Sequence, residues 1–131
     1  KMKEAGFNAI RMSHHPMAPA MLRACDEIGM YVMDETFDMW NRLKSNYDYG
    51  LYFQEWWEKD VTAMVRKDYN HPSVILYSVG NEIPEIGTDK ARRLVRKSVT
   101  RFVLWIIQDI RLHLSMVYLL QEMRWIRFVL M

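Results

Sequence analysis

The stretch that decides the fold lies near the middle of the chain and reads Asn70-His71-Pro72-Ser73-Val74-Ile75-Leu76-Tyr77-Ser78-Val79-Gly80-Asn81-Glu82. Its apolar centre is rich in β-branched residues and is bounded by Pro72 and Gly80, which is typical of a strand buried on both faces. Asn81 and Glu82 follow at once, and the carboxyl end of such a strand is where α/β folds place their chemistry. A plainer interpretation makes Glu82 a solvated acid that opens the next helix.

Two similar units precede this strand. A first strand is expected over residues 7–12, and a helix follows over residues 18–28 and stops at Gly29. A second strand is expected over residues 30–33, and after a loop comes a long helix whose apolar residues recur with a period of about 3.6 residues. That stripe consists of Phe53, Trp56, Trp57, Val61, Met64 and Val65. The order strand, helix, strand, helix, strand predicts an α/β fold with parallel strands.

Polar residues gather where each expected strand ends. They are Arg11 and His14 after the first strand, Asp34 and Glu35 after the second, and Asn81 and Glu82 after the third. Because the carboxyl ends of parallel strands meet at one edge, these side chains should form a common rim, as in a (β/α)8 barrel or a doubly wound sheet. No glycine-rich phosphate loop follows any strand, so we expect no nucleotide and no other cofactor.

Asp34 and Glu35 leave two interpretations open. They could bind a metal ion as hard oxygen ligands, or form a structural salt bridge with Arg11. We favour the salt bridge and expect no metal.

Composition narrows the classes of partner. The net charge is only +2, and lysines and arginines are interleaved with acids, which argues against nucleic acid. The basic residues at 92, 93, 96 and 97 resemble a phosphate patch, but the solvated face of a helix is the favoured interpretation. The single cysteine, Cys25, excludes an internal disulfide and is best explained as a buried structural thiol.

The composition changes in the last part of the chain. Residues 98–131 contain no Gly, Pro, Ala, Asn or Lys and show no clear helical stripe. Charged residues interrupt the segment before any apolar run reaches the roughly 20 residues that a membrane span needs, so no membrane partner is expected. The segment is either a buried or partner-binding helix pair or, as we favour, sequence that is not native, as after a reading-frame error. We therefore divide the chain into a domain of residues 1–97 and a tail of residues 98–131 without assigned function.

Three motifs in order resemble glycoside hydrolase family 2, the family of β-galactosidases and β-glucuronidases. Residues 8–16, Asn-Ala-Ile-Arg-Met-Ser-His-His-Pro, resemble its first hallmark, and residues 70–82 resemble its acid/base hallmark. Residues 32–35 and 37–40 are similar to its third strand and the following loop. The resemblance covers residues 1–97 and implies part of a TIM barrel catalytic domain, strands two to four.

The resemblance also implies roles for residues at the rim. Glu82 would be the general acid/base of a retaining mechanism, and Asn81 would contact the sugar 2-hydroxyl. His14 would line the sugar-binding subsite, and Arg11 would lie beneath and position the carboxylates. A carboxyl group shielded in an apolar barrel mouth can have its pKa raised for proton donation, which suits Glu82.

Two roles are possible for the tryptophans and for the histidine pair. Trp40, in the loop after the second strand, is our candidate for a ring that stacks on sugar, whereas Trp56 and Trp57 belong to a helical stripe and are assigned to the core. Outside the family context, His14 and His15 could be a turn pair satisfied by backbone groups.

The chain departs from the family pattern at several positions. Tyr77 stands where the family usually has Trp, Tyr69 where it usually has Arg or Lys, and His15 where Tyr is common. The nucleophilic Glu expected near the seventh strand has no counterpart, so the chain alone is expected to be inactive. The resemblance implies a β-galactosidase-like retaining β-glycosidase with a β-galactoside as its carbohydrate partner. The alternatives are a non-catalytic carbohydrate-binding relic and a broken reading frame without activity.

Overall fold

The computed structural model describes residues 1–108 and 128–130. The elements along the chain are β1 (Ala9–Arg11), α1 (Pro19–Ile28), β2 (Tyr31–Glu35), a 3-10 helix (Tyr49–Leu51), α2 (Phe53–Asp68), β3 (Val74–Ser78), α3 (Asp89–Gln108) and β4 (Phe128–Leu130). The order predicted from the sequence is confirmed as far as β3. The sequence did not predict β4.

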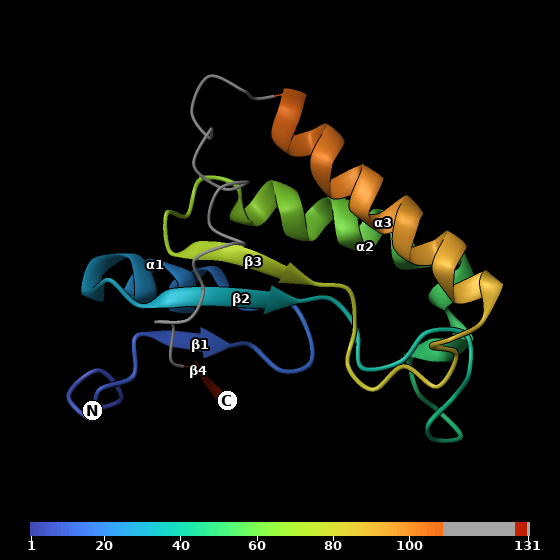
Figure 1. Cartoon of the computed structure of the whole chain (residues 1–131), viewed down its shortest axis with the longest axis horizontal. Helices are drawn as coiled ribbons and strands as arrows, with labels where there is room; N and C mark the ends of the chain where they lie inside the picture. Colours follow the sequence, from blue (N-terminus) through green and yellow to red (C-terminus); the bar gives the residue numbers. More distant parts are fainter. Residues whose placement is uncertain (109–127, 131) are drawn as a thin grey trace.

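The strands form one sheet in which every pairing is parallel, with the order β3-β2-β1-β4. Ile10 of β1 lies opposite Val32 of β2, and Val32 lies opposite Val74 of β3. The strand arrows point the same way, and the loops that follow β2 and β3 leave from the same edge of the sheet (Figure 1). The predicted α/β architecture is confirmed, and its parallel strands place three carboxyl ends side by side.

Helix α1 has sequence signals at both ends. Pro19 occupies its first turn, where the missing N–H costs nothing. Gly29 ends it with a φ of 65°, the left-handed conformation that favours glycine. Leu22 and Cys25 are buried against the sheet, in a core shared with Ile10, Met12, Met30, Val32 and Val74. The prediction of a buried Cys25 is confirmed.

Helix α2 buries the predicted apolar stripe, with one exception. The buried residues Phe53, Trp57, Val61, Met64 and Val65 pack with Phe37, Trp40, Ile83 and Ala91 in a second core. Trp56 is 42% exposed, so its assignment to the core is wrong. It lies one position away from Trp57, on a different face of the helix, with the Lys59 ammonium 4.0 Å from its ring centroid.

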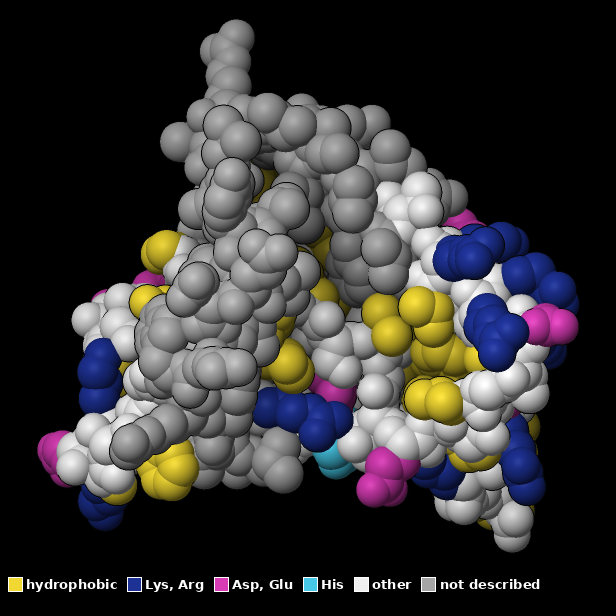
Figure 2. All heavy atoms as spheres, viewed as in Figure 1, with side chains coloured by type: hydrophobic (Ala, Val, Ile, Leu, Met, Phe, Trp, Pro, Cys, Tyr) yellow, Lys and Arg dark blue, Asp and Glu magenta, His cyan; other side chains and the backbone are white. Residues whose placement is uncertain are grey.

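Helix α3 crosses residue 97, where the tail was expected to begin, and ends at Gln108. Residues 109–127 and 131 lie outside the described residues, so the prediction of a non-native tail stays a prediction. The basic residues Arg92, Arg93, Arg96 and Lys97 are exposed, as expected of a solvated face, and Lys and Arg side chains gather over this helix (Figure 2). Among residues 1–108 and 128–130, no helix is both long and apolar enough to cross a membrane.

Candidate active site

A buried carboxylate, Glu35, lies at the centre of the rim. Arg11 from the end of β1 donates to its Oε2 from Nη2 (2.7 Å) and Nε (3.1 Å). Ser78 from the end of β3 donates to the same oxygen from Oγ at 2.5 Å. Nδ1 of His14 lies 2.7 Å from Oε1, so both oxygens of Glu35 are bound. Glu35 has no exposed surface, so the charge on which these three side chains converge is enclosed.

The partners of Glu35 determine its charge. Burial acts to raise the pKa of Glu35, but hydrogen bonds from Ser78, His14 and Arg11 outweigh burial and lower the pKa below its ordinary value. Glu35 is therefore an anion at neutral pH, and the predicted salt bridge with Arg11 is confirmed for this carboxylate.

The same prediction is wrong for Asp34. Its carboxylate turns to Lys67 of α2 and to the backbone N–H of Met17 instead. No cluster of three or more His, Cys, Asp or Glu side chains suited to a metal ion occurs among the described residues.

Asn81 is held by several hydrogen bonds beyond the end of β3. Its Oδ1 accepts a hydrogen bond from Arg11 Nη2 (3.0 Å), and its Nδ2 donates to Asp38 Oδ1 (2.9 Å). Its backbone N–H donates to the carbonyl oxygen of Phe37 at 2.9 Å. The Arg11 and Asp38 contacts fix which way the amide faces, and one of its two N–H groups has no hydrogen bond to the described residues.

Asp38 and Lys44 complete the surroundings of Asn81. Lys44 Nζ lies 2.8 Å from Asp38 Oδ1 and 3.0 Å from the backbone oxygen of Asn81. Hydrogen bonds from Lys44 and Asn81 lower the pKa of Asp38, so this carboxylate is ionised at neutral pH. Sequence reasoning gave neither residue a role. Asp38 lies in a motif that resembles the family, whereas nothing in the local sequence marks Lys44.

Glu82 has an uncommon backbone conformation. Its φ is 42°, in the left-handed region that non-glycine residues seldom adopt and that is enriched at functional sites. Its side chain is exposed, and within the described part of the chain no hydrogen bond or ion pair holds the carboxylate. Glu82 is a solvated acid, as the plainer interpretation expects, but it does not open the next helix, because α3 begins at Asp89.

Trp40 requires a correction. Only 2% of the residue is exposed, and its ring stacks on Phe53 at a centroid distance of 6.1 Å. Its Nε1 donates to the backbone oxygen of Val79 at 3.0 Å. Gly80 permits this packing, since a Cβ there would lie 3.1 Å from Trp40 Nε1 and 2.7 Å from Ile83. Trp40 thus supports the end of β3 and presents no free face on which a sugar could stack.

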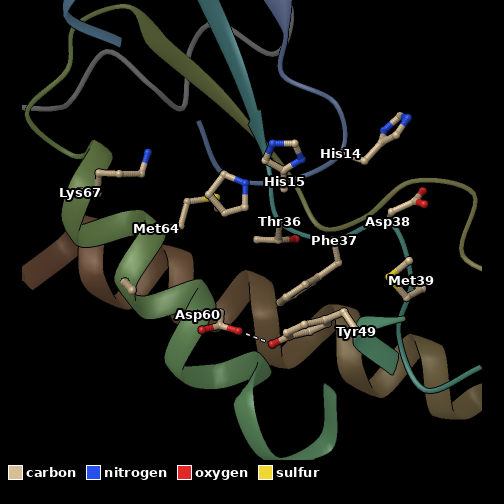
Figure 3. A pocket seen from close by; sticks show the side chains of 12 residues that line it. His14, His15, Thr36, Phe37, Asp38, Met39, Tyr49, Asp60, Met64 and Lys67 are labelled. Atoms are coloured by element: carbon tan, nitrogen blue, oxygen red, sulfur yellow. Dashed lines mark hydrogen bonds between the residues drawn. The ribbon is translucent and has the colours of Figure 1, made fainter. Parts of the chain in front are cut away.

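A cavity of about 570 Å³ lies between the loops after β1 and β2 and helix α2. Tyr49 points at Asp60 of α2 and donates a hydrogen bond to it, while Met64 and Lys67 line the same helix face (Figure 3). His14 lies at the border of this cavity. Its ring binds the Glu35 side chain, so it is more than a turn residue satisfied by backbone groups.

Known proteins resemble this chain in sequence. The family described as glycosyl hydrolases family 2, TIM barrel domain, matches residues 1–122. A β-galactosidase from Bacteroides ovatus is 50% identical over 88 residues, which cover 67% of this chain and 10% of that protein. A putative β-glucuronidase from Formosa agariphila is 49% identical over 82 residues, which cover 62% of this chain and 8% of that protein.

Solved structures agree with this assignment. A family 2 member from Bacteroides cellulosilyticus has a TM-score of 0.76 at 46% identity, covering 79% of this chain and 13% of that one. A β-glucuronidase from Ruminococcus gnavus in complex with D-glucaro-1,5-lactone has a TM-score of 0.63 at 28% identity, covering 77% and 16%. The chain belongs to glycoside hydrolase family 2 and forms part of its TIM barrel domain. It spans about a tenth of the length of the curated relatives it matches.

Proposed function

We propose that this chain supplies the acid/base side of the active site of a retaining β-glycosidase, with Glu82 as general acid/base and β-galactosides as substrates. One arrangement carries the proposal. Asn81 is fixed by Arg11 and Asp38 at the rim, and the next residue, Glu82, adopts a left-handed backbone with its carboxylate free for a ligand. Membership of a family of glycosidases supports the same function.

The chemistry assigns a task to each group. Glu82 would protonate the departing glycosidic oxygen and then, as a carboxylate, take a proton from the attacking water. The remaining N–H of Asn81 would donate to the sugar 2-hydroxyl, a hydrogen bond that strengthens in the oxocarbenium-like transition state. His14, whose Nδ1 is bound to Glu35, would offer its other ring nitrogen to the sugar. The nucleophile would be a second carboxylate about 5–5.5 Å from Glu82, supplied by the rest of the barrel.

The charges near Asn81 support a neutral sugar. The Lys44 ammonium uses two of its three N–H donors on Asp38 and on the backbone oxygen of Asn81, and the Asp38 carboxylate already balances its charge. Asp38 is ionised and would repel a uronate carboxylate. These two features favour a β-galactoside over a β-glucuronide.

A graft tests the role of Glu82. The matched 88-residue segment of the Bacteroides ovatus β-galactosidase would be replaced by the corresponding residues of this chain, giving a graft enzyme. Glu82→Gln should slow hydrolysis of β-galactosides with poor leaving groups by about 10²–10⁴-fold, because one positioned proton donor contributes that much. Dinitrophenyl β-galactoside, whose leaving group needs little protonation, should lose much less in the glycosylation step. Glu55→Gln, an exposed glutamate on α2, is the control and should leave both rates unchanged.

Azide provides a second readout. It should restore turnover of the Glu82→Gln graft and give a β-configured glycosyl azide, because it attacks the glycosyl-enzyme without base assistance. Equal losses on good and poor leaving groups without azide rescue would mean that Glu82 is not the acid/base. An inactive but folded graft that still binds galactose would favour the carbohydrate-binding relic.

A parallel graft tests the substrate. This chain would replace the matched segment of the putative β-glucuronidase from Formosa agariphila. We expect that graft to turn over glucuronides poorly, while the galactosidase graft keeps its activity. The reverse pattern would overturn the choice of galactosides.

A further inference from the structure

Two buried aspartates lie behind the rim. Asp34 is in β2 and Asp68 is the last residue of α2, and neither has exposed surface. One ammonium serves both: Lys67 Nζ lies 3.2 Å from Asp34 Oδ2 and also binds Asp68 Oδ1. If both carboxylates were ionised, this enclosed cluster would hold two negative charges against one positive charge.

The hydrogen-bond donors around the pair are unevenly divided. Asp34 Oδ1 accepts from the backbone N–H groups of Met17 (3.0 Å) and Glu35 (3.1 Å). Asp68 Oδ2 is buried, and no donor among the described residues reaches it. A proton on Asp68 would remove the excess negative charge and give its buried oxygen a partner, because the two aspartate side chains lie within hydrogen-bonding contact. The O–H of Asp68 then donates to Asp34, and the net charge of the cluster becomes zero.

We propose that Asp34 and Asp68 share one proton, and that this pair, with Lys67, is the positioning element of the loop over residues 13–17 that carries His14. The buried geometry of the two aspartates supports the shared proton without the proposed function. Only its consequence for His14 rests on the proposed function.

Met17 at the end of the loop packs against the core of β1, β2 and α1, whereas the part of the loop that carries His14 depends on polar contacts for its position. The cavity of about 570 Å³ separates His14, His15 and Pro16 from α2, so little packing holds the loop against that helix (Figure 3). Two hydrogen bonds tie the loop to β2: His14 Nδ1 to Glu35, and the Met17 N–H to Asp34. Loss of the shared proton would leave two ionised carboxylates repelling each other beside the Met17–Asp34 hydrogen bond.

The charged and titratable groups facing the pair are Lys67 of α2 and Tyr77 of β3. Burial, and then Asp34, raise the pKa of Asp68 to about 7, although Lys67 acts in the opposite direction. Burial and the two aspartates also raise the pKa of Tyr77, so Tyr77 stays neutral over the same range. The proton is therefore shared below about pH 7 and is lost as the pH rises above this value.

Carboxyl-carbon NMR of the full chain labelled at aspartate Cγ tests the shared proton. In the unsubstituted chain, one aspartate should titrate with an apparent midpoint near pH 7, and the Met17 amide resonance should shift with the same midpoint. Asp68→Asn keeps a donor facing Asp34, so it should remove this midpoint and leave the Met17 amide constant between about pH 5 and 8. Asp89→Asn, an exposed control, should behave like the unsubstituted chain. Completion of every aspartate titration below about pH 5, or a Met17 amide that ignores the midpoint, would overturn the proposal.

The graft enzyme supplies a second measurement. Its melting temperature should fall between about pH 5 and 7, because the folded pair retains a proton that an unfolded aspartate has lost, and Asp68→Asn should flatten that slope. The graft's kcat/KM should decline above neutral pH, and Asp68→Asn should reduce the decline. Parallel melting curves for the two proteins would overturn the shared proton. An inactive graft that shows the predicted melting difference would instead count against the proposed function alone.

Discussion

Replacing Arg11 by methionine should be costly because it leaves Glu35 enclosed without its cation. The substitution removes two hydrogen bonds to Glu35 and one to Asn81, while the similar length of methionine preserves much of the packing. Removing one partner of a buried ion pair costs about 3–5 kcal/mol, and since the Arg11 side chain is 26% exposed we expect the lower end, about 3 kcal/mol. With a urea m-value of about 2 kcal/mol/M, the unfolding midpoint should fall by about 1.5 M.

The cost should depend on pH with a defined sign. In the unsubstituted chain the pKa of Glu35 is lowered, so its stabilising contribution is present above the unfolded pKa and is lost as the pH falls through the folded pKa. Without Arg11, the pKa of Glu35 is lowered only by the hydrogen bonds from Ser78 and His14, so it lies higher than in the unsubstituted chain and the variant gains less stability as the pH rises above the folded pKa. The difference between the two proteins should therefore be largest near pH 7 and smallest near pH 4.

Urea unfolding of the full chain, followed by tryptophan fluorescence at several pH values, measures this effect. Arg23→Met, on an exposed face of α1, is the control and should stay within about 0.5 kcal/mol of the unsubstituted chain. The double variant Arg11→Met/Glu35→Leu should recover part of the loss, since an apolar pair carries no unpaired charge. A loss below about 1 kcal/mol that does not vary with pH would refute the assigned role of the Arg11–Glu35 pair.

Three further outcomes follow from burial and from the extent of the match. Trp40→Phe should lower the free energy of unfolding by about 1–2 kcal/mol because the Val79 carbonyl loses its donor. Trp56→Phe, at an exposed position, should change it by less than about 0.5 kcal/mol, and urea unfolding compares the two variants. The Cys25 thiol should react with a disulfide reagent only after unfolding, because burial, and then Asp26, raise its pKa. The absorbance of the released thiol with and without urea measures this, and rapid reaction of the folded chain would contradict the prediction. The full chain should not hydrolyse nitrophenyl β-galactoside, because its match to the β-galactosidase covers only 10% of that protein and the proposed mechanism needs a second carboxylate from the rest of the barrel. Release of nitrophenol by the full chain would contradict this prediction.

Local patterns predicted the elements, because local interactions form them. The end of α1 at Gly29 follows from the left-handed conformation that glycine adopts there. The strand order follows from apolar runs separated by helices. The assignments to Trp56 and Trp57 show the limit of a helical pattern: adjacent residues point about 100° apart, and composition alone did not say which one faces the core.

The site was less predictable where it depends on contacts between distant segments. Lys44 reaches the backbone of Asn81 across 37 positions of sequence, and Asn81 reaches Asp38 across 43. The burial of Trp40 likewise depends on packing against Phe53 and the end of β3, so its position in a loop did not indicate that it is buried. Residues placed directly at strand ends, such as Arg11 and Glu35, were predictable because the sheet itself brings them together.

The hydrogen bonds around Glu35 also specify how the strands align during folding. In one direction, a slip of two positions would still bring an apolar side chain to the same core, with Met30 in the place of Val32. Glu35 would not tolerate this slip, because Arg11 on one side and Ser78 on the other each reach it from a single position. The pairing of β2 with β3 is irregular between Val32 and Met33, just before this point, which lets apolar stacking and polar contacts both be satisfied. A misaligned sheet would leave a charge buried without partners, so the group at the centre of the rim also selects against incorrect pairing.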